Sequence, residues 1–262
     1  MNLNEKCELL RSLHVPGKPL VLPNAWDVAS AKVVVEAGFP VVATTSAGVA
    51  ASLGYEDHEG APSEEMLAAA GRISAGVEVP VTVDAEAGYG LDATALVAEL
   101  KRIGVAGCNL EDTDHATGQQ REAGEQAAWI AAVHAAAEAE DYPLVINARI
   151  DNYIGEFVAR LKSGDTSPSS QEHHLPDATD RARRYLDAGA TCVYPIALHQ
   201  PDQIAALVKE TDGMINIARM PQAAGVAELA DLGIARISFG GGLFMETMRA
   251  FAEKVAAVAP AS

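Results

Sequence analysis

The chain alternates between short apolar runs and longer segments with helical spacing, and this alternation restricts the possible folds most strongly. The eight apolar runs cover residues 19–24, 40–46, 79–86, 107–112, 143–151, 191–197, 214–220 and 235–241. Between them lie alanine-rich segments in which apolar residues recur every three or four positions. Strands that alternate with helices form parallel sheets. Eight such units predict a closed (β/α)₈ barrel, and 262 residues suit one barrel domain spanning 1–262.

The first apolar run argues against the main alternative, a doubly wound sheet. Such a sheet usually carries a phosphate-binding glycine fingerprint after its first strand. Here the first run ends in Leu-Pro-Asn-Ala-Trp-Asp, residues 22–27. We therefore predict an α/β fold of the TIM-barrel type, in which chemistry takes place at the carboxyl ends of the strands.

The charge of the chain restricts its partners. Lys and Arg number 19 against 36 Asp and Glu, which gives a formal net charge of −17 at pH 7. Nucleic acids and anionic membrane surfaces need a basic footprint, so we expect neither as a partner. No apolar run approaches the roughly 20 residues of a membrane-spanning helix, and the N-terminus lacks the apolar core of a signal peptide. We therefore expect a soluble, cytoplasmic protein.

The cysteines give no sign of a disulfide framework. There are three, Cys7, Cys108 and Cys192, and the last two sit in apolar runs. An odd count without a close pairing motif predicts buried free thiols.

Acidic residues gather at the predicted ends of neighbouring strands. Asp84 and Glu86 end the third run, and because side chains alternate along a strand, both point to the same side. Glu111 and Asp112 end the fourth run, and Asp57 follows the second run in a glycine-rich loop. Two carboxylates about 4 Å apart repel by roughly 4 kcal/mol at an effective dielectric near 20, so several converge only around a counter-charge, a proton or a cation.

A hard divalent cation offsets this repulsion. Mg²⁺ prefers octahedral oxygen ligation, keeps several waters and takes only one or two carboxylates directly. The pattern therefore predicts a magnesium site at the barrel mouth, with the remaining acids holding the waters of the metal. The alternative is that the acids cap helices or pair with arginines.

Other strand ends suit an anionic substrate. Arg149 ends the fifth run, where it either forms a structural ion pair with Asp151 or Glu111 or grips a substrate carboxylate or phosphonate. The small-residue turn Ser46–Gly48 offers backbone N–H groups, although a plain turn fits equally well. Gly240–Gly242 after the eighth run could cradle a phosphate or simply form a tight turn.

Two other barrel chemistries lack their residues. A Schiff-base aldolase needs a lysine at a strand end, and no lysine of the chain ends a predicted strand. A zinc hydrolase barrel needs several histidines at strand ends. The candidate histidines lie in loops or past strands without a His-x-His pair, and we interpret the polar stretch around His173 and His174 as an exposed loop.

Seven segments together resemble the isocitrate lyase/phosphoenolpyruvate mutase superfamily over nearly the whole chain. They read LPNAWDVASAKVVVEAGF, TTSAGVAASLGYED, VTVDAEAGYG, GVAGCNLED, NARIDNYI, AGATCVYPIA and LGIARISFGGGL. The resemblance implies a barrel of the phosphoenolpyruvate/pyruvate-domain type that forms a homo-oligomer, a dimer or a tetramer built as a dimer of dimers, often with swapped C-terminal helices. It also implies Mg²⁺ or Mn²⁺ and a small 2-oxo acid or enolate.

The same resemblance implies roles for individual residues. The metal site would use Asp84 as direct ligand and, acting through water, Asp57, Glu86 and Glu111, although many members carry Asp in place of this Glu86. The substrate site would use amides of the small-residue turn, a carboxylate clamp and a pocket-lining amide, which are Ser46, Ala47, Gly48, Arg149 and Asn216. We expect the catalytic residues to be Arg149, Glu111 and Ser46.

The chain also departs from the family pattern. The lyases carry a Lys-Arg/Lys-Cys-Gly-His loop after the fourth strand, with Cys as catalytic acid, but eight residues past Glu111 this chain has Gln119. The mutase branch has a Lys with a nearby Asn in this loop, and neither is present. At the end of the sixth run, where relatives have His or Glu, stands Ile196. The acid and base groups therefore differ while the metal-binding core is retained.

These features predict a Mg²⁺-dependent lyase that cleaves a C–C bond of a small 2-oxo or 2-hydroxy (di)carboxylic acid through a metal-stabilised enolate. Oxaloacetate decarboxylation and a retro-aldol cleavage like that of methylisocitrate lyase both fit. One alternative is cleavage or rearrangement of a C–P bond, and another is a catalytically weak barrel that binds 2-oxo acids. The proton donor is left open between water, His115 and Tyr89.

Overall fold

The structure is a computed structural model that describes residues 1–164, 171–219 and 224–258. Its barrel strands are β1 (Leu20–Leu22), β2 (Asn24–Ala25), β3 (Val42–Thr44), β4 (Val81–Asp84), β5 (Gly107–Glu111), β8 (Val145–Ile150), β9 (Cys192–Pro195), β10 (Asn216–Ala218) and β11 (Arg236–Ser238). They pair in parallel in the orders β2-β3-β4-β5-β8-β9 and β1-β11-β10. A parallel bridge between Val193 and Ile215 joins β9 to β10. The predicted (β/α)₈ TIM barrel is thereby confirmed.

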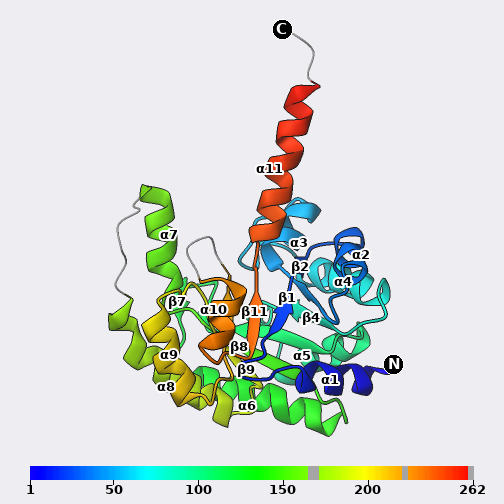
Figure 1. The fold of residues 1–262 in the computed structure, drawn as a ribbon. Coiled ribbons are helices and arrows are strands. Elements are labelled where there is room, and N and C mark those ends of the chain that lie inside the picture. The colour runs from blue at the N-terminus through cyan, green and yellow to red at the C-terminus, as the bar shows by residue number, and fades with distance from the viewer. Residues whose placement is uncertain (165–170, 220–223, 259–262) are drawn as a thin grey trace.

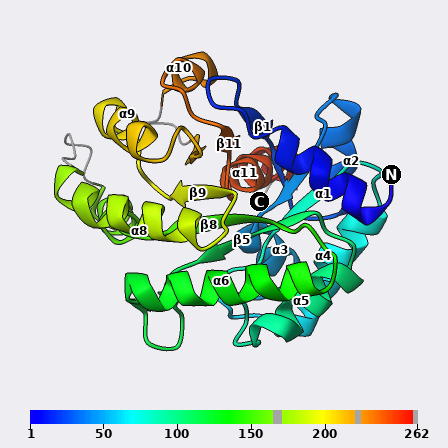
Figure 2. The ribbon, with the colours of Figure 1, turned by 90° about the horizontal axis from the view of Figure 1, so that it is seen from below.

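Helices surround these strands in the view from below (Figure 2). The helices are α1 (Leu3–Ser12), α2 (Val28–Glu36), α3 (Ser46–Leu53), α4 (Ser63–Ala75), α5 (Ala93–Arg102), α6 (Ala123–Ala139), α7 (Ile154–Ser163), α8 (Leu175–Asp187), α9 (Pro201–Glu210), α10 (Val226–Asp231) and α11 (Gly242–Ala257). A short hairpin, β6 (Thr113–Asp114) with β7 (Gln119–Gln120), follows β5, and a 3₁₀ helix, η1 (Glu172–His174), precedes α8. The helices α7 and α11 project from the same end of the barrel (Figure 1).

Pro23 interrupts the first barrel strand, and the side chain of Asn24 bridges the interruption. Proline has no N–H for the strand ladder, so β1 pairs with β11 while β2 pairs with β3. Asn24 Nδ2 donates to the carbonyl of Thr44 at 2.7 Å, and Asn24 Oδ1 accepts from the amide of Phe239 at 2.8 Å. One buried amide group therefore connects β3 to the segment that follows β11.

Two minor features complete the comparison with the sequence. All three cysteines are buried and free, as expected. Within the described ranges, no helix combines the length and the apolar character that crossing a bilayer requires.

Gly107 sets the distance between β5 and β8 at the lower end of the barrel. It is paired with Val145, and a Cβ atom on Gly107 would lie 2.6 Å from the Val145 carbonyl oxygen and 2.9 Å from Leu10 Cδ2. Leu10 is fully buried and belongs to α1. Because one of the two obstacles is backbone, a larger residue here would force the strands apart.

We expect Gly107→Ala to lower the free energy of unfolding by about 1–3 kcal/mol through overpacking. Urea denaturation followed by circular dichroism measures the change. Gly124→Ala is the matched control, because a Cβ at this position in α6 meets nothing within 4 Å. An unchanged urea midpoint for Gly107→Ala would contradict the close packing described here.

Candidate active site

The carboxyl ends of β4 and β5 bring the predicted acids to one end of the barrel. Asp84 is the last residue of β4 and Glu111 the last of β5, and these strands are neighbours, with Asp84 paired to Asn109. Glu86 follows two residues after Asp84, at the start of the connection to α5. The fold thus places three of the four predicted metal-site acids on adjacent strand ends.

Asp84 is held by the residues that follow β3. Its Oδ2 accepts a hydrogen bond from Ser46 Oγ at 2.9 Å and from the Ser46 amide at 3.2 Å. Its own amide donates to Thr44 Oγ1 at 2.9 Å. Asp84 Oδ1 is buried and has no hydrogen-bond partner among the described residues. One carboxylate oxygen is therefore fixed, and the other is available to a ligand.

Glu86 is anchored by a loop that the sequence analysis did not single out. Glu86 Oε1 accepts the amide of Glu59 at 2.6 Å, and Glu59 Oε1 accepts the amide of Tyr89 at 2.7 Å. His58, Glu59, Glu86 and Tyr89 all have positive φ angles, between 49° and 65°. Such backbone is costly for residues other than glycine, and it concentrates at functional sites. The acid-rich stretch Glu56–Glu59 was a usable signal for this loop.

The acids at the mouth influence one another electrostatically. The pKa of Glu86 is raised to about 7, chiefly by burial and additionally by the negative charges of Asp84, Asp57 and Glu111. Asp57 Oδ1 is buried and, like Asp84 Oδ1, lacks a hydrogen-bond partner in the described parts of the chain. The negative charges of Asp84, Asp57 and Glu111 therefore all act on Glu86.

Glu111 and Asp151 share the guanidinium of Arg149. Arg149 Nη1 contacts Glu111 Oε2, and Arg149 Nε donates to Asp151 Oδ1 at 2.6 Å. His115 Nε2 contacts the other oxygen of Glu111. Burial raises the pKa of Glu111, and Arg149 opposes this shift. The structural ion pair that the sequence left open is thus present, and any contact of Arg149 with substrate would be additional to it.

Asp112 faces away from this cluster and serves the structure. It is fully buried and accepts hydrogen bonds from Tyr185 Oη at 2.8 Å, from Arg181 Nη1 at 3.1 Å and from the Asp151 amide at 3.0 Å. Arg181 also donates to Asp177 at 2.8 Å. Since neighbouring side chains on a strand point to opposite sides, Glu111 and Asp112 separate into the mouth and the outer wall.

The small-residue turn is not a loop. Residues 46–48 form the first turn of α3, which starts directly after β3. A Cβ on Gly48 would lie 2.8 Å from Thr45 Cγ2 and 3.0 Å from Trp26 Cβ, so tight packing explains the glycine. A helix start still presents amides that have no partner within the helix.

Asn216 and Gln119 occupy contrasting positions. Asn216, in β10, is fully buried and donates through Nδ2 to Ser238 Oγ at 3.0 Å. Gln119, in β7, is exposed on the hairpin that follows β5. The β6–β7 hairpin also carries His115, whose ring centroid lies 5.4 Å from that of His58. His115 contacts Glu111, and His58 lies beside His115; both residues are in loops.

The acids at the mouth fit a magnesium ion held mainly through water better than a tight carboxylate cage. In the described ranges, no three of these acids have oxygens within 4.8 Å of one another. The donor set consists of oxygens only, and the unpartnered oxygens of Asp84 and Asp57 provide places for an ion or its waters. The predicted repulsion is relieved partly by Arg149 and partly by the raised pKa of Glu86.

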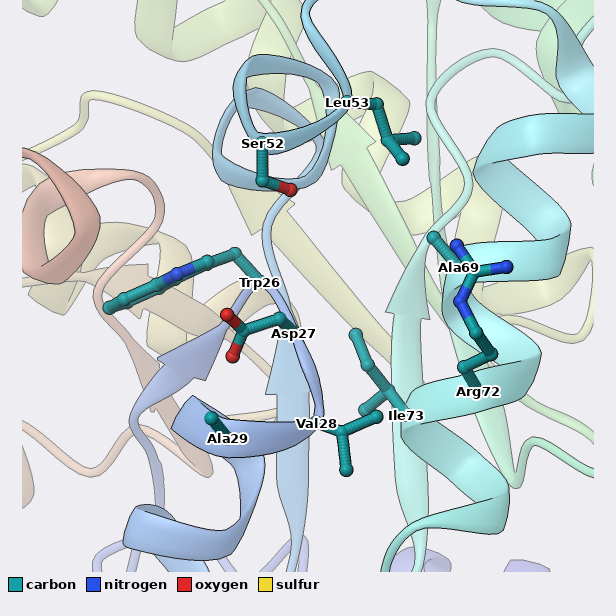
Figure 3. Close-up of a pocket in the computed structure, with 9 residues that line it drawn as sticks. All are labelled: Trp26, Asp27, Val28, Ala29, Ser52, Leu53, Ala69, Arg72 and Ile73. Atoms are coloured by element: carbon teal, nitrogen blue, oxygen red, sulfur yellow. The ribbon is translucent and has the colours of Figure 1, made fainter.

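A pocket of about 400 Å³ lies elsewhere, between α2, α3 and α4 (Figure 3). Asp27 and Arg72 line it together with apolar side chains, and Trp26 borders it. Asp27 caps α2 by accepting the Ser30 amide at 2.7 Å. None of the predicted site residues lines this pocket, so it is separate from the barrel mouth.

We expect Asp112→Ala to lower the free energy of unfolding by about 3–5 kcal/mol, because it leaves the buried Arg181 without its buried counter-charge. Asp180→Ala is the control, since it removes only the exposed pair with Arg184 and should cost at most about 1 kcal/mol. Thermal and urea unfolding compare the two variants. Equal losses would show that Asp112 carries no special structural role.

Comparison with known proteins identifies the family. Residues 10–259 match the family model described as phosphoenolpyruvate phosphomutase. The uncharacterised protein Rv1998c of Mycobacterium tuberculosis (strain ATCC 25618 / H37Rv) is 33% identical over 228 residues, covering 87% of this chain and 80% of that protein. The 2,3-dimethylmalate lyase of Eubacterium barkeri is 30% identical over 195 residues, covering 71% and 61% respectively.

A solved structure gives the same result. The crystal structure of a protein from Burkholderia cenocepacia J2315, provisionally described as a phosphonomutase, matches with a TM-score of 0.87 and 38% identity, covering 97% of this chain and 100% of that one. The barrel fold is therefore shared with that protein. The chain belongs to the phosphoenolpyruvate phosphomutase family, within the isocitrate lyase/phosphoenolpyruvate mutase superfamily of lyases and mutases.

Proposed function

We propose that this protein is a Mg²⁺-dependent lyase that breaks the carbon–carbon bond next to a carbonyl in a small 2-oxo or 2-hydroxy dicarboxylic acid. The observation that carries the proposal is the presence, at one end of the barrel, of the buried unpartnered Asp84 Oδ1 and the buried guanidinium of Arg149. The reaction needs a cation at one end of the substrate and a positive side chain at the other. The family relation to 2,3-dimethylmalate lyase supports this bond type.

The cation would be held by the acids of the mouth. Asp84 would be the direct ligand, and Asp57, Glu86 and Glu111 would hold its waters. Mg²⁺ or Mn²⁺ bound there would supply Lewis acidity and a counter-charge for a developing enolate. Ser46 keeps the Asp84 carboxylate oriented through two hydrogen bonds, so its effect on catalysis would pass through that ligand.

Arg149 has donors left for a substrate carboxylate. A guanidinium carries five N–H groups. Hydrogen bonds to Asp151 engage Nε and Nη2, and Nη1 lies in ion-pair contact with Glu111. The Nη hydrogens that are not bonded to Asp151 suit a forked contact with a carboxylate. The amides of Ala47 and Gly48 at the start of α3 would hold an oxyanion of the substrate. Asn216 would line the substrate pocket.

His115 is better placed than Tyr89 to supply a proton. Its Nε2 contacts Glu111 at the mouth, and the residue lies in the loop between β6 and β7. The hydroxyl of Tyr89 lies 3.5 Å from the backbone carbonyl of Asp84, and burial raises the pKa of this phenol well above its usual value. A phenol with so high a pKa is a weak acid at neutral pH.

We expect Mg²⁺-dependent release of pyruvate or a similar oxo acid when the purified protein is tested against a panel of 2-oxo and 2-hydroxy dicarboxylates, with EDTA abolishing it. Asp84→Ala should lower kcat/KM by more than about 100-fold and weaken Mg²⁺ binding in calorimetry. Glu125→Gln, an exposed acid in α6, is the matched control. Full activity of Asp84→Ala with metal still bound would rule out this site.

A second candidate function is cleavage or rearrangement of a C–P bond. The 38% identity to the protein provisionally described as a phosphonomutase favours it. Release of phosphate from phosphonopyruvate, or formation of phosphoenolpyruvate, would decide for this reaction. A third candidate is a catalytically weak barrel that binds 2-oxo acids. The exposed Gln119, at the position of the lyase cysteine, favours it. Binding without turnover of any substrate would decide for that one.

We also propose that the protein is a homo-oligomer, a dimer or tetramer, that assembles through α11. This helix projects from the barrel and has no buried residue (Figure 1). It exposes an apolar stripe at helical spacing, with Met245 70% and Phe251 57% accessible, and with Met248 and Val255 also exposed. An exposed stripe of this kind is typical of an interface.

We expect the double variant Met248→Glu/Phe251→Glu to reduce the molar mass measured by size-exclusion chromatography with light scattering. Burial of glutamates in an apolar interface is unfavourable, so the assembly should dissociate. Lys254→Glu changes charge on the same helix outside the stripe and serves as control. A monomeric parent protein, or a double variant of unchanged mass, would refute assembly through α11.

A further inference from the structure

A second group of metal-binding side chains lies outside the barrel mouth, where α7 meets η1. Glu156 belongs to the first turn of α7, and His173 and His174 belong to η1. One ligand atom from each lies within 4.8 Å of the other two. In the part of the chain that the structure describes, no other three His, Cys, Asp or Glu residues come so close. The fold thus gathers two imidazoles and a carboxylate from two elements.

The contacts within this group leave a nitrogen atom available. His174 Nε2 lies 3.5 Å from Glu156 Oε2, which is long for a strong hydrogen bond. This nitrogen is buried and has no hydrogen-bond partner among the described residues. The rings of His173 and His174 lie with centroids 3.8 Å apart, so two positively charged rings would repel.

We propose that Glu156, His173 and His174 form a binding site for a divalent transition-metal ion of the zinc class. Two imidazole nitrogens and one carboxylate oxygen are a ligand set that zinc favours, and they leave a fourth tetrahedral position for water. The ligand set differs from the all-oxygen set at the mouth, which favours magnesium. Zinc–ligand bonds of about 2.0–2.2 Å require the three groups to draw closer.

The ion would fasten α7 to η1 and steady one wall of the barrel mouth. The ring of Tyr153 packs edge-on against His174, with centroids 5.1 Å apart. Tyr153 follows Asp151 by two residues, and Asp151 holds Arg149. The proposed site is therefore linked to Arg149, the predicted carboxylate clamp, through Tyr153 and the ion pair of Asp151. The inference does not depend on the proposed lyase reaction.

Zinc binding to the EDTA-treated, desalted full-length protein tests the inference. Calorimetry and elemental analysis would be carried out with millimolar Mg²⁺ present to occupy the mouth. We expect one zinc equivalent in the parent and in Asp84→Ala, and its loss in His173→Ala/His174→Ala. Glu156→Gln, which keeps the shape of the side chain, should weaken zinc binding by at least about tenfold. His134→Ala is the matched control, because His134 Nε2 also lies 3.5 Å from a glutamate, Glu138, but on a single helix.

A second readout separates this site from the mouth. Zinc should slow amide hydrogen exchange in the segment 154–163 of the parent and of Asp84→Ala, but not of the double histidine variant. Melting temperatures check that each variant is folded. Unchanged zinc uptake by the folded double variant would overturn the inference, and so would uptake that disappears in Asp84→Ala. Neither result bears on Mg²⁺-dependent turnover, which is measured separately.

Discussion

The barrel mouth depends on one buried cation, the guanidinium of Arg149. It lies between Glu111 and Asp151 at the ends of adjacent strands, and all three side chains are almost inaccessible to solvent. Without it, two buried carboxylates would face each other unpaired, which typically costs several kcal/mol. In a chain of net charge −17, acids are plentiful and buried cations are what permit them to gather. Arg181 does the same for Asp112 on the outer side of the same strand end.

Much of the fold could be predicted from the sequence because the barrel repeats one local pattern. Each predicted apolar run contains a strand of the barrel, and Asp92 caps α5 as its residue type suggests, by accepting the Ala95 amide. The starts of other helices were harder to predict from the sequence. Ser63 begins α4 after Pro62, and Asp177 lies inside the first turn of α8, where it pairs with Arg181.

The acids of the candidate site could be predicted from the sequence, but the residues that bind these acids could not. Asp84 ends β4, but Glu86 lies past the strand in left-handed backbone, so the two-residue period does not explain its position. The same period could have separated Asp112 from Glu111. The partners of Asp112 are Arg181 and Tyr185, which lie 69 and 73 residues further along the chain. The anchoring of Glu86 by Glu59 rests on positive φ angles that no local propensity favours. Contacts of this kind form only when the barrel closes, so the spacing of residues along the sequence does not predict them.

The family relation and the reaction are separate questions, because a barrel supports many chemistries through its loops. Relatives of this chain carry the names of both lyases and mutases. In this protein the β6–β7 hairpin holds His115 against Glu111 and leaves Gln119 exposed.

The two hydrogen bonds of the Asn24 side chain make the fold sensitive to deamidation of this residue. Its side chain must donate to the Thr44 carbonyl and accept from the Phe239 amide at the same time, which only a primary amide of this length does here. Deamidation would replace the donor by an oxygen that faces another oxygen in a buried setting. Such a mismatch costs about 1–3 kcal/mol, so spontaneous chemical damage to a single atom would loosen the junction between the two sheets.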